Sequence, residues 1–160
     1  MNGFASAMFY TITYAITAAV GFGVLIVLNR QGFEAEDISD LSGLNDSNPW
    51  YAALLAIALF SMAGVPPTVG FYAKLSVLQA IIQVDIIWLA VVSVLFSVIG
   101  LFYYLRVVKV MYFDGPSESN SISIKSALDV RVLLSANSLS LILLGIFPSV
   151  LMVWCMTAFN

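Results

Sequence analysis

The sequence contains no histidine and a single cysteine, Cys155. Without histidine, no His-based metal site or imidazole proton relay can form. One cysteine excludes an intrachain disulfide and any multi-cysteine metal or iron–sulfur site. Charged residues are also scarce, at 9% of the 160 residues, and the net charge of −3 argues against a basic nucleic-acid-binding surface. Because hydrophobic residues make up 61%, the chain has too little polar surface for a water-soluble globule, which excludes a soluble enzyme and indicates a membrane protein.

Long uncharged stretches separate the few charges. A helix needs roughly 20 apolar residues to cross a hydrocarbon core about 30 Å thick. The apolar runs are continuous, which favours helices over strands, in which apolar and polar residues would alternate. The sequence therefore predicts an all-α transmembrane fold with about four membrane elements, at residues 4–28, 50–84, 86–113 and 130–159. Pro148 is expected to kink the last element.

The polar connections predict how the chain is oriented. If every element crosses once, the connections 29–49 and 114–129 share one side, with five of the six cations: Arg30, Arg106, Lys109, Lys125 and Arg131. Cytoplasmic loops are enriched in Lys and Arg. We therefore predict a multi-pass protein of a bacterial inner (plasma) membrane, with both termini on the outer, periplasmic side. Aromatic residues near the predicted ends, Tyr104 among them, are expected at the membrane–water interface.

The second element is too long for one straight helix. Its 35 residues would extend roughly 52 Å at 1.5 Å per residue. Two consecutive prolines near its middle remove backbone donors and push the preceding residues away from helical geometry. We predict a discontinuous helix, with halves at about 50–63 and 68–84, and with a break formed by Gly64, Pro66, Pro67 and Gly70. Broken helices often form transport sites in membrane proteins, and a proline kink with only a packing role is the alternative.

Lys74 is the only charged residue between Asp46 and Asp85. It lies 11 residues before Asp85, roughly 16 Å along a helix, which is about half of the hydrocarbon thickness. A charged lysine at the centre of a span costs about 2.5–3.5 kcal/mol on insertion scales, so such residues usually mark functional sites. Lys74 is therefore the candidate intramembrane proton carrier. A structural cation bonded to carbonyls freed by the break is the alternative.

Hydroxyl groups offer a candidate polar path beside Lys74. On the first predicted helix, Tyr10, Thr13, Tyr14 and Thr17 are spaced so that they share one face. Each hydroxyl alone is weak evidence, because Ser and Thr in membrane helices commonly bond their own backbone. The candidate path residues are Tyr14, Thr17, Ser61, Thr68 and Ser97.

The segment Leu59–Lys74, LFSMAGVPPTVGFYAK, resembles a signature of the antiporter-like, proton-translocating membrane subunits of respiratory complex I (NADH–quinone oxidoreductase), most closely of the subunit N family. The stretches Gly100–Val107 and Leu144–Pro148 are similar to the last helices of that family. The resemblance extends over essentially the whole chain. It implies that residues 1–160 are the C-terminal portion of such a subunit, and that Lys74 matches a lysine thought to pass protons towards the outer side.

The resemblance also implies a function and a set of partners. The chain is expected to be a membrane-arm subunit of a proton-translocating NADH–quinone oxidoreductase and to supply part of a proton path coupled to quinone reduction. No cofactor is expected in this chain, and NADH, FMN, Fe–S clusters and quinone belong to other subunits. The expected partners are the other membrane-arm subunits, the missing N-terminal helices of the same subunit and the lipid bilayer, with no nucleic acid. Because the first repeat of the family has no counterpart here, a fragment or a shortened reading frame is expected.

Two other functions remain open at this point. A subunit of a multisubunit cation/proton antiporter would share the broken helix and the lysine, and its transport would depend on sodium without NADH oxidation. A non-transporting structural membrane subunit would keep the motif without using it. In that case Lys74→Ala would leave proton pumping unchanged.

Overall fold

The structure is a computed structural model that describes residues 3–30, 37–115 and 127–159. These residues form helices, turns and bends, with no strand among them, as the all-α prediction requires. The longer helices are α1 (Gly3–Arg30), α3 (Pro49–Ala63), α4 (Val69–Gln83), α5 (Ile87–Phe113), α6 (Leu128–Ile146) and α7 (Pro148–Thr157). A short 3₁₀ helix, η1 (Ile38–Leu41), and the single turn α2 (Leu44–Ser47) precede α3.

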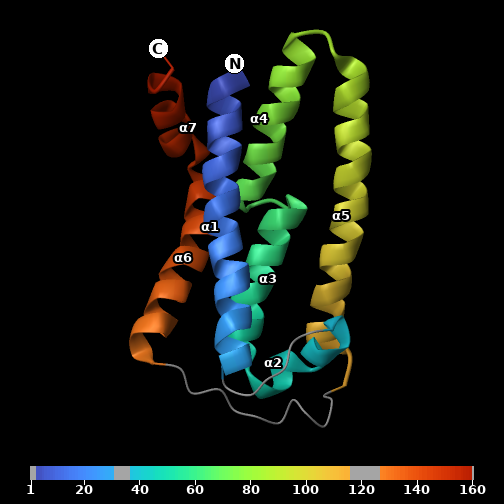
Figure 1. The fold of residues 1–160 in the computed structure, drawn as a ribbon, viewed down its shortest axis with the longest axis vertical. Helices are drawn as coiled ribbons and strands as arrows, with labels where there is room; N and C mark the ends of the chain where they lie inside the picture. The colour runs from blue at the N-terminus through green and yellow to red at the C-terminus, as the bar shows by residue number, and fades with distance from the viewer. Residues whose placement is uncertain (1–2, 31–36, 116–126, 160) are drawn as a thin grey trace.

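The helices run alternately up and down in a bundle (Figure 1). Both ends of the chain lie at one end of this bundle, here called the terminal end, together with the turn between α4 and α5. The end of α1, the start of α3, the end of α5 and the start of α6 lie at the other, the loop end. The helix ends that flank the two long connections therefore lie at one end, as predicted, and the start of α1 and the end of α7 lie at the other.

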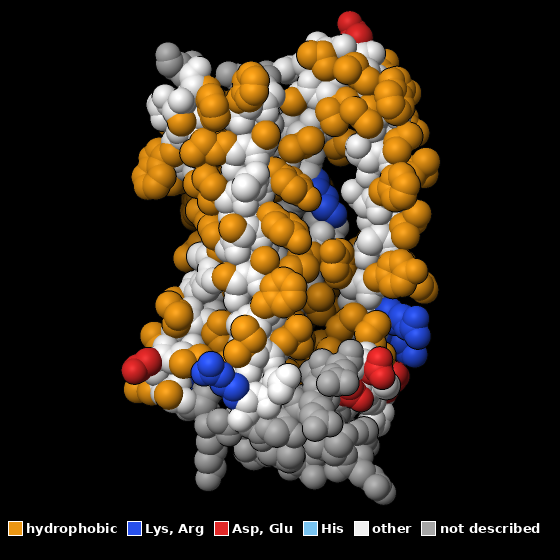
Figure 2. Space-filling model, in the orientation of Figure 1, with side chains coloured by type: hydrophobic (Ala, Val, Ile, Leu, Met, Phe, Trp, Pro, Cys, Tyr) orange, Lys and Arg blue, Asp and Glu red, His pale blue; other side chains and the backbone are white. Residues whose placement is uncertain are grey.

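The bundle is built around α1, which packs against α3, α4, α6 and α7. Its buried side chains, among them Phe9, Val20 and Leu28, join apolar residues of α3 in one core. In contrast, α5 lies on the outside, and only its Ala90 and Met111 are buried. Among the residues that the structure describes, three helices, α1, α5 and α6, are long and apolar enough to cross a membrane, and the shorter apolar helices are α3, α4 and α7. Apolar side chains cover most of the surface in Figure 2, as expected of a membrane protein.

The second predicted element is broken where the prolines indicated. Helix α3 ends at Ala63, as predicted, and α4 begins at Val69, one residue after the predicted bound. The two half-helices follow one another along the bundle, with the break near mid-height (Figure 1). Together α3 and α4 make one pass, which neither half is long enough to make alone.

The last predicted element, at 130–159, is not one kinked helix but two helices. Helix α6 ends at Ile146, and α7 begins at Pro148. Phe147 lies between them with φ −119° and ψ 60°, outside the helical region. The reason is local: Pro148 lacks an N–H and disfavours helical geometry in the residue before it, while its fixed φ suits the first position of a new helix.

Candidate functional site

The end of α3 is closed by a backbone motif that requires glycine. Gly64 has φ +79° and ψ 40°, in the left-handed region that glycine adopts without strain. Its N–H donates to the carbonyls of Phe60 and Ser61, and the Val65 N–H also donates to Phe60. This Schellman arrangement satisfies carbonyls of the last turn of α3. The carbonyl of Ala63, the last residue of α3, accepts from a side chain instead.

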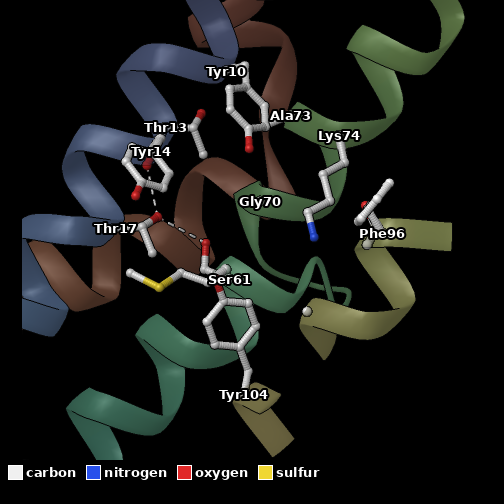
Figure 3. A pocket seen from close by; sticks show the side chains of 13 residues that line it. Tyr10, Thr13, Tyr14, Thr17, Ser61, Gly70, Ala73, Lys74, Phe96 and Tyr104 are labelled. Carbon is white, nitrogen blue, oxygen red and sulfur yellow. Dashed lines mark hydrogen bonds between the residues drawn. The ribbon is translucent and has the colours of Figure 1, made fainter. Parts of the chain in front are cut away.

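That side chain is Lys74, which reaches back across the break from the second turn of α4. Its Nζ donates to the Ala63 carbonyl oxygen at 3.0 Å. A cation at the C-terminus of a helix is stabilised by the partial negative charge of the exposed carbonyls there. Figure 3 shows the Lys74 side chain extending from α4 toward the segment that joins α4 to α3. The half-buried ammonium is thus held by the broken helix itself.

A polar pocket of about 250 Å³ opens beside Lys74 between α1, α3, α4 and α5. An ammonium carries three donors, of which Ala63 uses one. The described lining residues include no carboxylate, and this volume has room for several water molecules. The lining residues are Tyr10, Thr13, Tyr14, Thr17, Ser61, Met62, Gly70, Ala73, Lys74, Phe96, Ser97, Gly100 and Tyr104.

Two hydroxyls in this pocket form a direct link between α1 and α3. The Thr17 hydroxyl donates to the Thr13 carbonyl at 2.8 Å and lies 3.2 Å from the Ser61 hydroxyl. Since Thr17 has only one hydroxyl hydrogen, Ser61 is the donor in the contact between them. Thr17 and Ser61 are each 2% exposed. The Ser61 oxygen therefore keeps the capacity to accept a hydrogen bond from the pocket.

The Thr13 hydroxyl lies one turn along α1 from Thr17. It is buried and has no hydrogen-bond partner in the part of the chain that the structure describes. A buried hydroxyl without a partner costs free energy unless water satisfies it. Thr13 is also among the residues that line the pocket.

The structure brings most of the predicted site residues together. Tyr14, Thr17, Ser61 and Ser97 line the same pocket as Lys74. Thr68 does not: its hydroxyl donates to the Val65 carbonyl at 2.6 Å and closes the turn of the break. The break residues serve the backbone geometry, with Pro66 and Pro67 joined by a cis peptide bond between Gly64 and α4.

Gly70 was predicted to form part of the break, but it lies in the first turn of α4, where it has a different role. A Cβ atom at this position would overlap the carbonyl oxygen of Ser61. Glycine therefore allows the first turn of α4 to contact the backbone of α3 directly. This close approach brings Ser61 and Lys74 to the same pocket.

Tyr104 is the site residue that sequence reasoning missed most clearly. It was expected at the membrane–water interface, but its side chain lines the pocket below Ser61 (Figure 3). Tyr10 and Thr13 also line the pocket, and their shared face on α1 with Tyr14 and Thr17 was a usable signal. The spacing of Tyr104 from the candidate Ser97, seven residues earlier on α5 with Gly100 between them, was also a usable signal, because residues at this spacing share one helix face.

A second hollow, of about 210 Å³, lies on the other side of Lys74 between α4 and α5. Its walls are mainly apolar, with Leu75, Leu78, Val98 and Leu101, and it shares Lys74 and Ser97 with the polar pocket. Figure 2 shows a basic side chain exposed in the gap between α4 and α5, halfway along an otherwise apolar face. Lys74 therefore stands between a polar and an apolar environment.

This arrangement suits transfer of a proton. The pocket offers a titratable amine, hydroxyls that both donate and accept, and room for water. The part of the chain that the structure describes holds no group of three or more Cys, Asp or Glu residues that could bind a metal ion.

The chain is similar to curated bacterial proteins over nearly all of its length. It is 58% identical over 151 residues to the NADH-quinone oxidoreductase subunit N of Thioalkalivibrio sulfidiphilus, covering 94% of this chain and 31% of that protein. It is 55% identical over 157 residues to the subunit of the same name from Herminiimonas arsenicoxydans, covering 98% of this chain and 31% of that protein. The chain therefore spans about a third of the length of the curated relatives it matches.

Solved structures share the fold. Respiratory complex I from Thermus thermophilus with bound aureothin contains a chain that superposes with a TM-score of 0.77 at 21% identity, over 93% of this chain and 34% of that one. The Mrp complex from Dietzia sp. contains another with a TM-score of 0.77 at 19% identity, over 97% and 37%. The model of the family described as "NADH:quinone oxidoreductase/Mrp antiporter, TM" matches residues 1–100. This chain, a membrane protein with a broken helix and a lysine bonded across the break, belongs to that NADH:quinone oxidoreductase/Mrp antiporter transmembrane family.

Proposed function

We propose that this chain is the C-terminal portion of subunit N of a bacterial NADH–quinone oxidoreductase, and that Lys74 carries protons in its membrane arm. The observation that carries the proposal is the placement of Lys74: its amine sits at the break of a membrane helix, bonded to the Ala63 carbonyl and open to a hydroxyl-lined pocket. The high identity to curated subunits of that name supports this function over that of a cation/proton antiporter subunit.

Lys74 would act by alternating between two protonation states. As an ammonium it is held by the Ala63 carbonyl and the exposed carbonyl end of α3. As a neutral amine it can accept a proton from water or a hydroxyl in the pocket. Changes driven by quinone reduction in other subunits would shift the balance between these states, and the proton would leave toward the terminal end of the bundle.

The cofactors and the other subunits of the complex lie outside this chain. NADH, FMN, Fe–S clusters and quinone belong to other subunits, so this chain contributes to a translocase without redox chemistry of its own. Its partners are the other membrane-arm subunits, the N-terminal helices of the same subunit and the lipid of a bacterial inner membrane. The terminal end of the bundle faces the periplasm, since the cations gather at the loop end.

Two substitutions of Lys74 test the proposal in membrane vesicles that carry the assembled complex. Lys74→Ala removes the amine, and Lys74→Arg keeps a positive charge that cannot be released as a proton. Both are expected to lower NADH-driven proton pumping, normalised to complex content, by about 10²-fold, the lower range for loss of a positioned acid–base group. A purely structural cation predicts a different pattern, in which Lys74→Arg pumps nearly normally.

Lys109→Ala is the matched control. Lys109 pairs with Asp114 at 3.5 Å, and their side chains are 68% and 40% exposed. Exposed ion pairs of this kind contribute about 0–1 kcal/mol, so this variant should pump like the wild type. Normal pumping by Lys74→Ala with normal assembly would refute the proposal. Sodium-dependent transport without NADH oxidation would identify an antiporter instead.

A further inference from the structure

Two helix breaks lie against one another in this fold. The junction between α6 and α7, at Phe147, is near the same height as the break between α3 and α4 (Figure 1). Gly145, buried in the last turn of α6, makes the contact. A Cβ atom at Gly145 would overlap the Pro67 carbonyl oxygen and lie 2.6 Å from the Thr68 carbonyl carbon. The two segments therefore touch backbone to backbone.

This contact is not a general property of the glycines in the bundle. A Cβ at Gly21, in the middle of α1, would meet only the Met62 Cε atom, at an ordinary distance of 3.5 Å. A Cβ at Gly145 would also lie 2.7 Å from the Val69 backbone nitrogen. Backbone atoms cannot turn aside as the end of a flexible side chain can, so a methyl group at Gly145 must displace the start of α4 or the end of α6.

The start of α4 determines where the Lys74 amine lies. The bond from Lys74 Nζ to the Ala63 carbonyl spans the break, because the two residues belong to different half-helices. A shift of Pro67–Val69 relative to α3 therefore moves the Lys74 backbone relative to the Ala63 carbonyl and alters the geometry in which this bond is made. Gly145 itself is not among the residues that line the pocket. It can act on Lys74 only through the break.

We propose that Gly145 is a positioning residue, through which the α6–α7 junction holds the α3–α4 break and sets the distance from Lys74 Nζ to the Ala63 carbonyl. The inference rests on the proposed role of Lys74 as the proton carrier. It adds that α6 and α7 influence the geometry of the site, although they contribute none of the described side chains that line the pocket.

The test is Gly145→Ala in the assembled complex, with Gly21→Ala as the matched glycine control. Misplacing a reacting group by about 1 Å can cost on the order of 10²-fold, so pumping per complex should fall by about tenfold or more. The pH profile of pumping should also be displaced, since the contacts of the titrating amine change. Loss of packing alone would reduce the amount of complex and leave the pH profile of the remaining complex unchanged.

A double variant separates the two proposals. In the Lys74→Ala background, Gly145→Ala should cause no further loss, because both act on the same step. Wild-type pumping and pH profile in Gly145→Ala, with Lys74→Ala inactive, would overturn this inference alone. Normal pumping in Lys74→Ala would overturn the proposed function itself.

A second variant covers the case in which Gly145→Ala does not assemble. Pro148→Ala restores an N–H at the junction and allows α6 to continue through Phe147, without adding atoms beside Pro67. Pro148→Ala is expected to lower proton pumping per complex and to displace the pH profile of pumping. Wild-type behaviour of Pro148→Ala, when Gly145→Ala does not assemble, would overturn the inference.

Discussion

At the scale of single residues, Gly64 and Lys74 fit one another. A Cβ at Gly64 would lie 3.0 Å from the Lys74 Cδ atom and 3.5 Å from its Nζ. The residue with φ +79° that ends α3 is therefore also the one that leaves room for the lysine stem. One glycine thus meets two requirements, for the backbone of α3 and for the path of the Lys74 side chain to the Ala63 carbonyl.

The hydroxyl link between α1 and α3 gives a prediction at this scale. Thr17→Val removes the contact with Ser61 and keeps a similar side-chain volume. Hydrogen bonds between membrane helices contribute about 0.6 kcal/mol on average, so the complex should still assemble. We expect pumping to fall several-fold, because the hydroxyl that accepts from Ser61 is gone. The measurement is proton pumping per assembled complex.

Thr11→Val is the control for Thr17→Val. Thr11 lies on the same helix, and its hydroxyl donates to the Ala7 carbonyl at 2.9 Å on an exposed face. Its replacement removes an equivalent bond away from the pocket. Equal losses in the two variants would mean that Thr17 matters only for helix α1, and would remove the hydroxyl link from the proton path.

The sequence was sufficient to predict those parts of the site that depend on unusual single residues. A lone lysine in an apolar stretch and two consecutive prolines are rare and costly, so Lys74 and the break could be predicted. Thr68 could not be placed in the same way. Whether a hydroxyl closes its own turn or faces a pocket is decided by packing between helices, which the spacing of residues along one helix does not contain.

At the scale of helices, the contact between the end of α3 and the first turn of α4 depends on Gly70. Its missing side chain allows the first turn of α4 to lie directly on the Ser61 carbonyl.

The prolines in the sequence predicted both helix breaks, although the second was predicted only as a kink. The contact of Gly145 with Pro67 and Thr68 joins residues far apart in the sequence, so local patterns could not reveal that the two breaks meet.

Gly70→Ala is the prediction at the scale of helices. The new methyl group would overlap backbone atoms of Ser61, which cannot move without separating α3 from α4. Overpacking a core costs about 1–3 kcal/mol and sometimes more, so the amount of assembled complex should fall clearly. Gly3→Ala is the control, because a Cβ there meets nothing within 4 Å. Wild-type amounts of complex in both variants, measured by native gel electrophoresis, would contradict the packing described here.

At the scale of the whole molecule, the two ends of the bundle differ in the charged residues that they carry. Asp85 is in the turn between α4 and α5, at the terminal end, whereas Arg30, Arg106 and Arg131 lie near the loop end. Arg131 at the start of α6 also lies 5.1 Å above the ring of Trp50, a cation–π contact. Together these features predict which end of the bundle faces the cytoplasm.

Cysteine labelling in intact cells checks that orientation. In a Cys155→Ala background, Val84→Cys places an exposed thiol at the terminal end, and Asp46→Cys places one at the loop end. A membrane-impermeant maleimide should label Val84→Cys in intact cells and Asp46→Cys only after permeabilisation. The reverse pattern would invert the proposed orientation, and equal labelling would contradict the separation of the two ends by the membrane.

The two helix breaks also determine how the molecule meets bilayers of different thickness. Helix α1, with 28 residues, extends about 42 Å at 1.5 Å per residue, which exceeds a hydrocarbon layer of about 30 Å. An unbroken helix of this length adjusts to a thinner bilayer by tilting as a rigid rod. The passes made by α3–α4 and α6–α7 consist of shorter helices of 15, 15, 19 and 10 residues. A strain from hydrophobic mismatch would reach the segment that holds the lysine, so we expect proton pumping per complex to vary with the chain length of the surrounding lipid.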